Sequence, residues 1–200
     1  MMRPLSLGIF AAIATAGAAG SVDAATIVTF ADPSSGSATP LFEVNSNTAL
    51  LTGGWNAPGL LLETPGLPAP NFPDARFTIS AVSLLSPLPF ATLGPGQLSF
   101  FDSSNALLMT ITFSGGLLTS SFGFGGSEFQ GNNVTFSGPI LGGDVFTDEA
   151  FAFSFANPVA TQNGYQATAS FTSSATLVPT PAGLAALGMG GLALMRRRRA

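Results

Sequence analysis

The 200-residue chain contains no histidine, no cysteine and no lysine. These absences exclude imidazole acid–base chemistry, cysteine nucleophiles, lysine Schiff bases and the usual soft-metal sites. They also exclude disulfide bonds, so the fold must be stabilised by its own core. Carboxylates are the only groups left for acid–base catalysis, and a glycosidase of that kind needs two of them facing each other across a cleft. The composition therefore favours a protein that is not an enzyme.

Charge is also scarce and is mostly negative. Charged residues make up 8% of the chain, and the net charge at pH 7 is −4. Residues 25–177 contain one cation, Arg76, and nine acidic residues, so this stretch carries a net charge of −8. Because phosphate binding needs clustered Lys or Arg, we expect no nucleic-acid partner.

The first 24 residues have the pattern of a secretory signal peptide. Arg3 supplies a positive start, residues 5–19 form an apolar run, and small residues lead to a cleavage site after Ala24, with Ala25 nearly as good. This pattern predicts cleavage by signal peptidase after export through the inner membrane. No stop-transfer pattern follows, so we do not interpret the segment as an anchor.

The last 23 residues, 178–200, combine three features in a fixed order. Val178, Pro179, Thr180 and Pro181 come first, an apolar run at 182–195 follows, and Arg196, Arg197, Arg198 and Arg199 come last. The run is about 21 Å long as a helix, whereas a bilayer core usually needs about twenty residues. Clustered arginines beside a membrane segment stay in the cytoplasm. We therefore expect a short transmembrane helix with a cytoplasmic stop.

This tripartite tail resembles the PEP-CTERM sorting signal of Gram-negative bacteria. In that family, exosortase, a membrane cysteine protease, removes the helix and the arginines, and the body goes to the cell surface or matrix. The usual tetrapeptide is Val-Pro-Glu-Pro, and Thr180 replaces the glutamate here. The resemblance implies exosortase as a partner, transient contact with the membrane, and association with exopolysaccharide or biofilm.

The 25–177 body has the period of β-strands. Apolar and polar residues alternate around Phe77, along 107–113 and in the last two runs, which predicts that Phe151, Phe153, Phe155 and Phe171 point inward. Asn157-Pro158 and Asn163-Gly164 mark the turn region between those runs. We predict an all-β fold, an antiparallel β-sandwich of jelly-roll type, flanked by the signal peptide and the C-terminal helix.

Two groups of residues are candidate sites in the body. Asp144, Asp148 and Glu149 follow two glycines, and oxygen ligands on such a loop suit calcium, although a solvated turn is the ordinary role of such residues. Calcium is the one cofactor that these residues could bind; otherwise none is expected. Residues 52–74 are rich in glycine and proline and should form a long excursion on one side of the sandwich, which carries Trp55. Trp55 and Tyr165 are the only amphipathic aromatics and could stack on a sugar, whereas packing under a loop is the ordinary role.

These observations predict an exported, non-catalytic protein of the cell surface or matrix with a structural role. One alternative is a carbohydrate-binding module, which requires Trp55 and Tyr165 to be exposed on one surface. The other is a carboxylate-only glycosidase, which requires two carboxylates about 5 to 10 Å apart in a pocket.

Overall fold

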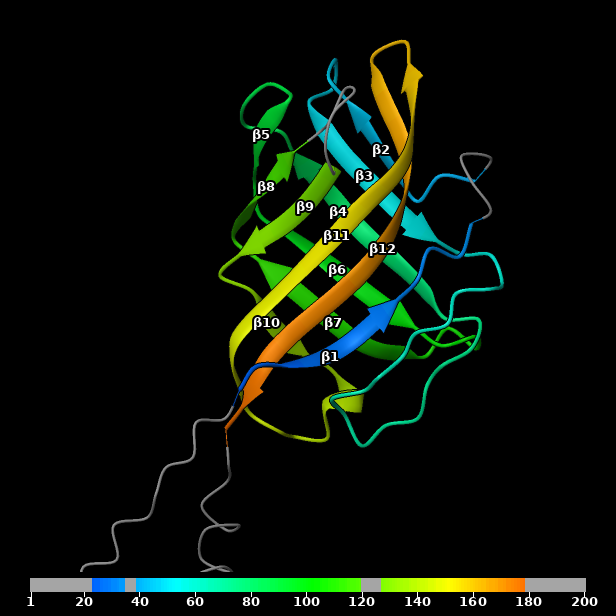
Figure 1. The fold of residues 1–200 in the computed structure, drawn as a ribbon, viewed down its shortest axis with the longest axis vertical. Helices are drawn as coiled ribbons and strands as arrows, with labels where there is room; N and C mark the ends of the chain where they lie inside the picture. Colours follow the sequence, from blue (N-terminus) through cyan, green and yellow to red (C-terminus); the bar gives the residue numbers. More distant parts are fainter. Residues whose placement is uncertain (1–22, 35–38, 120–126, 179–200) are drawn as a thin grey trace, which may run out of the picture.

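The computed structural model describes residues 23–34, 39–119 and 127–178. These residues form β-strands, turns and one short 3-10 helix, Pro139–Leu141, and contain no α-helix (Figure 1). The prediction of an all-β chain is confirmed. The predicted signal peptide, apart from its last two residues, and the tail from residue 179 onward lie outside the described residues.

The strands follow one another along the whole body. Their bounds are β1 (Ala25–Phe30), β2 (Phe42–Asn45), β3 (Leu50–Trp55), β4 (Arg76–Ser83), β5 (Phe90–Leu93), β6 (Gly96–Phe101), β7 (Leu107–Phe113), β8 (Gly115–Thr119), β9 (Ser127–Asn132), β10 (Thr135–Ser137), β11 (Phe146–Thr161) and β12 (Gly164–Leu177).

All twelve strands belong to one antiparallel sheet: eleven follow the order β10-β7-β6-β4-β3-β2-β12-β11-β9-β8-β5, and β1 lies off this path and pairs with β12. Strand β12 pairs with β11 along one edge, and with β2 and then β1 along its other edge. The sheet curls so that β9, β11 and β12 cross in front of β4, β6 and β7 (Figure 1). The result is sandwich-like, with an inner space between two facing halves of one sheet.

Both ends of this strand order have their edges covered. The first strand in the order, β10, has its Phe136 N–H bonded to Glu149 Oε1 of β11, at 2.8 Å. The last strand, β5, returns to the end of β4 through a Leu84–Leu93 bridge, and the Leu85 N–H donates to the Thr92 carbonyl at 2.7 Å. Covered edges leave few backbone groups free to pair with another chain.

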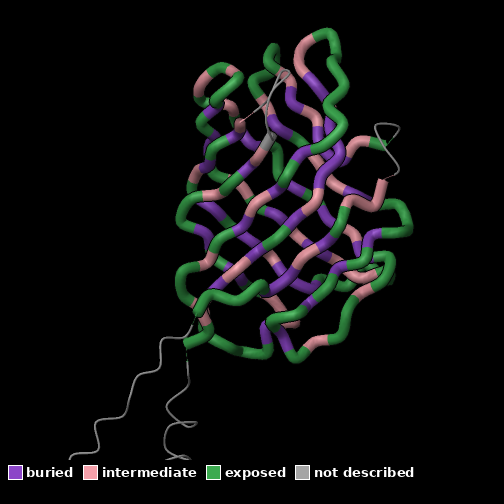
Figure 2. The backbone as a smooth tube through the Cα atoms, viewed as in Figure 1, coloured by how far each residue is buried: buried purple, intermediate pink, exposed green. Residues whose placement is uncertain are grey.

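Phenylalanine rings fill the space between the two halves. Phe153 is fully buried, and its ring lies within 4.8 to 6.1 Å of six others: Phe30, Phe42, Phe77, Phe129, Phe151 and Phe171. Phe151, Phe155 and Phe171 are also buried, so the predicted inward face is confirmed. Buried and exposed positions alternate along these strands (Figure 2).

Three irregularities depart from simple alternation. Ala81 is exposed and Val82 is buried, because the register of β4 against β3 shifts between Leu51 and Gly53. Leu108 is buried and Leu107 exposed for the same reason on β7, where the register shifts after Phe100. Asn157-Pro158 is not part of the last turn but lies inside β11, at a register shift between Ala156 and Val159. The turn itself is residues 162–163.

The β6–β7 turn is organised by one carboxylate. Asp102 Oδ1 accepts hydrogen bonds from the Ser104 hydroxyl at 2.7 Å, the Ser104 N–H at 2.8 Å and the Ala106 N–H at 2.9 Å. The Ser104 hydroxyl, followed by the other hydrogen bonds, lowers the pKa of Asp102 from its ordinary value, because each bond favours the charged form. Asn105 takes the left-handed conformation that the turn requires, at φ 68°.

The phenylalanine core gives a first prediction. Phe153→Ala should lower the free energy of unfolding by about 3–5 kcal/mol, because it removes a ring packed against six others and leaves a cavity. Ser154→Ala, the next and exposed position, should change stability by less than about 0.5 kcal/mol. Urea unfolding followed by circular dichroism measures both. Equal stabilities of the two variants would contradict the central place of Phe153.

A second prediction concerns acid stability. Because the pKa of Asp102 is lower in the folded protein than in the unfolded chain, its carboxylate contributes stability above the unfolded pKa, and this contribution is lost as the pH falls through the folded pKa. Asp102→Asn should therefore be less stable than the parent at neutral pH, and the difference should disappear at strongly acidic pH. Thermal melts across that range test this, with Asp144→Asn as the control. A difference that does not depend on pH would contradict it.

Candidate functional site

The body begins and ends side by side. Ala25, the first residue of β1, pairs with Ala175, and Leu177, the last residue of β12, pairs with Phe146. Val178 continues this pairing, since its N–H donates to the Val145 carbonyl at 2.9 Å. The first and last strands therefore reach the same end of the molecule (Figure 1).

Val178 is the only residue of the predicted sorting tail that the structure describes, and its side chain is exposed. The rest of the tail lies outside the described residues: Pro179, Thr180, Pro181, the 182–195 run and Arg196–Arg199. Within the described part of the chain, no helix has the length and apolar character needed to cross a membrane.

Trp55 and Tyr165 do not have the exposure that a sugar-stacking role requires. Their exposed fractions are 6% and 2%, so both belong to the core. Trp55 is the last residue of β3 rather than part of the Gly/Pro-rich excursion, and its ring follows Leu51 on the inward face. Tyr165 begins the inward row of β12 that Ala167 and Phe171 continue. The prediction of a shared sugar-binding surface is therefore corrected.

The three acidic residues near the start of β11 have separate roles. Glu149 bonds the Phe136 N–H and covers the β10 edge, whereas Asp148 Oδ2 accepts a hydrogen bond from the Thr147 hydroxyl at 3.3 Å. Asp144 lies on the exposed turn after the 3-10 helix, where its N–H donates to the Leu141 carbonyl. Across the described ranges, no three acidic residues are grouped so that they could hold a metal ion. Calcium binding here stays a prediction.

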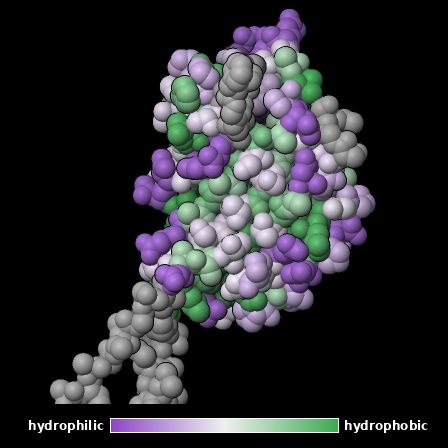
Figure 3. All heavy atoms as spheres, viewed as in Figure 1, coloured by the Kyte–Doolittle hydropathy of each residue, from purple (hydrophilic) through white to green (hydrophobic). Residues whose placement is uncertain are grey.

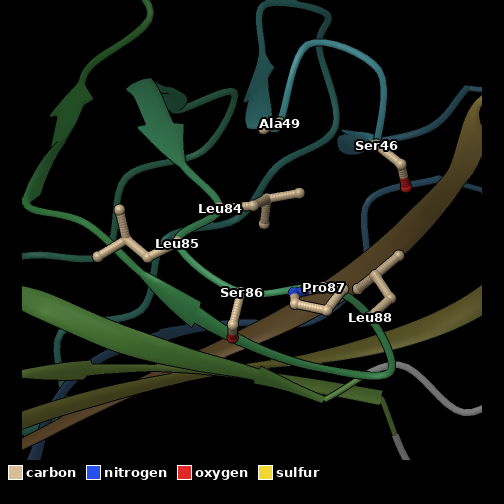
Figure 4. A pocket seen from close by; sticks show the side chains of 7 residues that line it. All are labelled: Ser46, Ala49, Leu84, Leu85, Ser86, Pro87 and Leu88. Carbon is tan, nitrogen blue, oxygen red and sulfur yellow. The ribbon is translucent and has the colours of Figure 1, made fainter.

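Two of the surface cavities among the described residues can be compared with the predicted sites. One has a volume of about 310 Å³ on the outer face of β11 and β12, where hydroxyl groups and one carboxylate, Glu63, line it. The other has a volume of about 260 Å³ and has a mainly apolar lining of Leu84, Leu85, Pro87 and Leu88, completed by Ser46, Ala49 and Ser86 (Figure 4). Neither of these two cavities contains the pair of carboxylates that a glycosidase needs.

The apolar cavity lies within a surface feature that the sequence did not predict, the meeting of three turns opposite the termini. The Leu84 N–H donates to the Ala49 carbonyl at 2.8 Å, and the Ser46 N–H donates to the Asn163 carbonyl at 2.7 Å. These bonds join the β2–β3 turn, the loop after β4 and the β11–β12 turn. We call residues 46–49, 84–90 and 158–163 the uncharged end, because none of them is charged. The sequence feature that could have indicated this end is the apolar stretch 84–95, which contains three prolines.

Comparison of the chain with protein-family models, with curated proteins and with solved structures gives no match. The low content of charged residues is visible at the surface. On the face that β9, β11 and β12 form, polar and apolar side chains are mixed, without one continuous strongly hydrophilic area (Figure 3). The arrangement of the chain's own residues is thus the basis for a functional assignment.

A third prediction concerns Glu149. Glu149→Ala should destabilise the protein by about 1–3 kcal/mol, because the Phe136 N–H loses its partner, whereas Glu149→Gln retains an acceptor oxygen and should cost less. Thermal melts of both, each repeated with millimolar calcium and with chelator, separate the two roles of this carboxylate. If calcium binds Asp144, Asp148 and Glu149, the parent's midpoint rises with calcium and that of Glu149→Gln does so less. If the parent's melting midpoint is the same with calcium as with chelator, calcium does not bind here, and Glu149 acts only through its hydrogen bond to the Phe136 N–H.

Proposed function

We propose that the protein is an exported, non-catalytic protein of the cell surface or matrix, sorted by a PEP-CTERM/exosortase-type system. The observation that carries this proposal is the agreement between the fold and the predicted processing sites. The first strand begins at Ala25, directly after the predicted signal peptide, and the last ends at Leu177, directly before the sorting motif. Every residue that the sheet needs thus lies between the two predicted cuts.

The position of the tail supports removal without damage to the body. A cut between Val178 and Pro181 would leave β12 complete, because its last pair is Leu177 with Phe146. An apolar helix of about fourteen residues is a marginal permanent anchor, and small residues within it favour close contact with another membrane protein. The arginines would hold the tail from the cytoplasmic side until the cut, since moving them through hydrocarbon costs several kcal/mol.

The proposed role after release is structural. The finer fold assignment, a jelly-roll type of sandwich between a signal peptide and a short helix, is part of this proposal. Association with exopolysaccharide agrees with the outer face of β11 and β12, where Ser154, Ser170 and Thr172 present hydroxyl groups around a shallow cavity. Hydroxyl groups can exchange hydrogen bonds with a polysaccharide without a dedicated aromatic platform. The burial of Trp55 and Tyr165 argues against the alternative of a dedicated carbohydrate-binding module.

The fourth prediction is that the mature protein recovered from the native cell surface starts near Ala25 and ends between Val178 and Pro181. Mass spectrometry of the intact protein measures both ends. Replacing Arg196–Arg199 with neutral residues should cause mis-sorting or release of uncut protein, because the cytoplasmic stop is lost. Replacing Pro179 and Pro181 should leave an uncut form in the membrane.

Arg76→Gln is the matched control, because it removes a cation from the body without changing the tail. It should be cut and sorted like the parent. A mature protein that still carries Arg196–Arg199 would show that the tail is an ordinary anchor and would overturn the sorting proposal.

A further inference from the structure

The cavity of about 310 Å³ on the outer face of β11 and β12 lies where rows of side chains cross the sheet. Thr172 of β12 pairs with Ala152 of β11, and Ala152 pairs with Gln130 of β9, the next strand of the same face (Figure 1). Residues that pair across antiparallel strands point to the same face of the sheet. Ala152 therefore lies between two longer side chains, and the surface is hollowed at this position.

A carboxylate lies on each side of this cavity. On the β12 side, Thr172 pairs with Thr29 of β1, and Thr29 forms an isolated bridge with Glu63 through N–H to carbonyl distances of 2.9 and 3.0 Å. On the β9 side, Glu128 pairs with Ser154 of β11. Glu63 is exposed and lines the cavity, and Ser154, the partner of Glu128, lines it too. The cavity thus has a strong hydrogen-bond acceptor on two opposite sides.

The lining between the two carboxylates carries hydroxyl groups. Those of Ser154, Ser170 and Thr172 have no hydrogen-bond partner among the described residues, whereas Thr29 donates its own to the Phe171 carbonyl at 2.7 Å. A hydroxyl group can donate one hydrogen bond and accept two. Hydroxyl groups that face solvent beside carboxylates suit a ligand that is itself rich in hydroxyl groups, because each partner can both donate and accept.

The size of the cavity favours a polymer over a small molecule. Cavities that bind whole small molecules have volumes of about 300 to 1,000 Å³, so this one is at the lower limit and holds a short stretch of a larger ligand. Glu63 and Glu128 are four strand spacings apart, about 19 Å along the sheet. Hydrolysis of a sugar chain requires two carboxylates within about 10 Å, so this arrangement suits binding rather than cleavage.

Charge decides which hydroxyl-rich polymer fits. None of the residues that line the cavity is a cation, and Arg76, the one cation of residues 25–177, begins β4 in the facing half of the sheet. A polysaccharide with carboxylate groups would meet Glu63 and Glu128 without a counter-charge, and like charges repel. A neutral polysaccharide avoids this repulsion and can donate charge-assisted hydrogen bonds to both carboxylates.

We propose that this cavity is a binding site for a neutral polysaccharide. Glu63 and Glu128 accept hydrogen bonds from its sugar hydroxyl groups, and Ser154 and Thr172 bond the stretch between them. The site rests on the proposed function, because a polysaccharide ligand presupposes a place at the cell surface or in the matrix. It adds the class of polysaccharide and the residues that select it.

Affinity electrophoresis of the chain in detergent, with a soluble polysaccharide cast in the native gel, tests this site. Galactomannan, mixed-linkage β-glucan and dextran are the neutral probes, and alginate is the acidic one. Arg196–Arg199 are replaced with glutamine in every sample, so that the tail cannot bind alginate. The parent should be retarded by at least one neutral probe and not by alginate.

Two variants and a matched control locate the binding. Ala152→Phe should weaken binding of the neutral probe by about tenfold or more, because the ring fills the cavity. Ala81→Phe, the same change at an exposed position of β4, should leave binding unchanged. The double variant Glu63→Gln and Glu128→Gln should weaken neutral binding by about tenfold, since two charge-assisted bonds become ordinary ones, and should lessen the exclusion of alginate.

The other outcomes overturn the proposal. Equal retardation of the parent, Ala152→Phe and the double variant would place binding elsewhere, and no retardation by any neutral probe would exclude the ligand class. Retardation by alginate alone would show that charge does not select the ligand. A homodimer in light scattering that Ala152→Phe dissociates, without retardation of the parent, would assign this face to a second copy.

Loss of fold and failure of sorting give different results. Circular dichroism spectra and thermal melts of the variants should match those of the parent, and the double variant adds no bulk if Ala152→Phe does not fold. A protein that is cut at both predicted ends but is not retarded overturns only the polysaccharide site. A protein that is retarded but keeps its tail at the native cell surface overturns only the sorting proposal.

Discussion

Strand β12 bonds to β11 on one side and to β2 and β1 on the other, and this shared pairing joins the halves of the curled sheet. Phe171, on its inward row, packs against the ring of Phe153 at 4.8 Å and against the ring of Phe100 of β6 at 5.2 Å between ring centroids. Hydrogen bonding along β12 and ring packing beneath it therefore depend on each other. Without that strand, β1 would lose the strand it pairs with, and β2 would keep only β3.

The body folds without a disulfide bond and with few charged residues. Its sheet has a core made mainly of phenylalanine, valine, isoleucine and leucine, and its outer faces use serine and threonine. Three carboxylates of the described residues bond the backbone: Asp102 holds a turn, Glu149 covers an edge, and Asp74 Oδ1 accepts from the Gly59 N–H at 2.8 Å. Such bonds satisfy backbone donors that strands leave free at turns and edges. Acidic residues are thus structural as well as solubilising.

Sequence alternation predicted the all-β class, the strand along 107–113 and the inward face of Phe151, Phe153, Phe155 and Phe171. It did not predict the shifts at Ala81 and Leu108, because a bulge reverses the inward face by one residue and depends on the partner strand. The glycines around Trp55 predicted a loop. Strand β3 instead continues to Trp55, because the missing side chain of Gly53 leaves room for the Phe42 ring. The uncharged end could not be predicted, since three turns distant in sequence meet there only through the topology.

The place of β12 in the chain has a consequence for folding order. Strand β1 is made first and its partner β12 last. Val28 and Ser173 are 145 residues apart, and the Ser173 hydroxyl group accepts a hydrogen bond from the Val28 N–H and donates one to the Val28 carbonyl. Pairings this distant in sequence form late, because the loop between them must close first. In a chain threaded through a membrane from its N-terminus, the sheet could close only once residue 177 had crossed. On the proposed route of export, the body would therefore complete its sheet only when the predicted tail alone was still in the membrane.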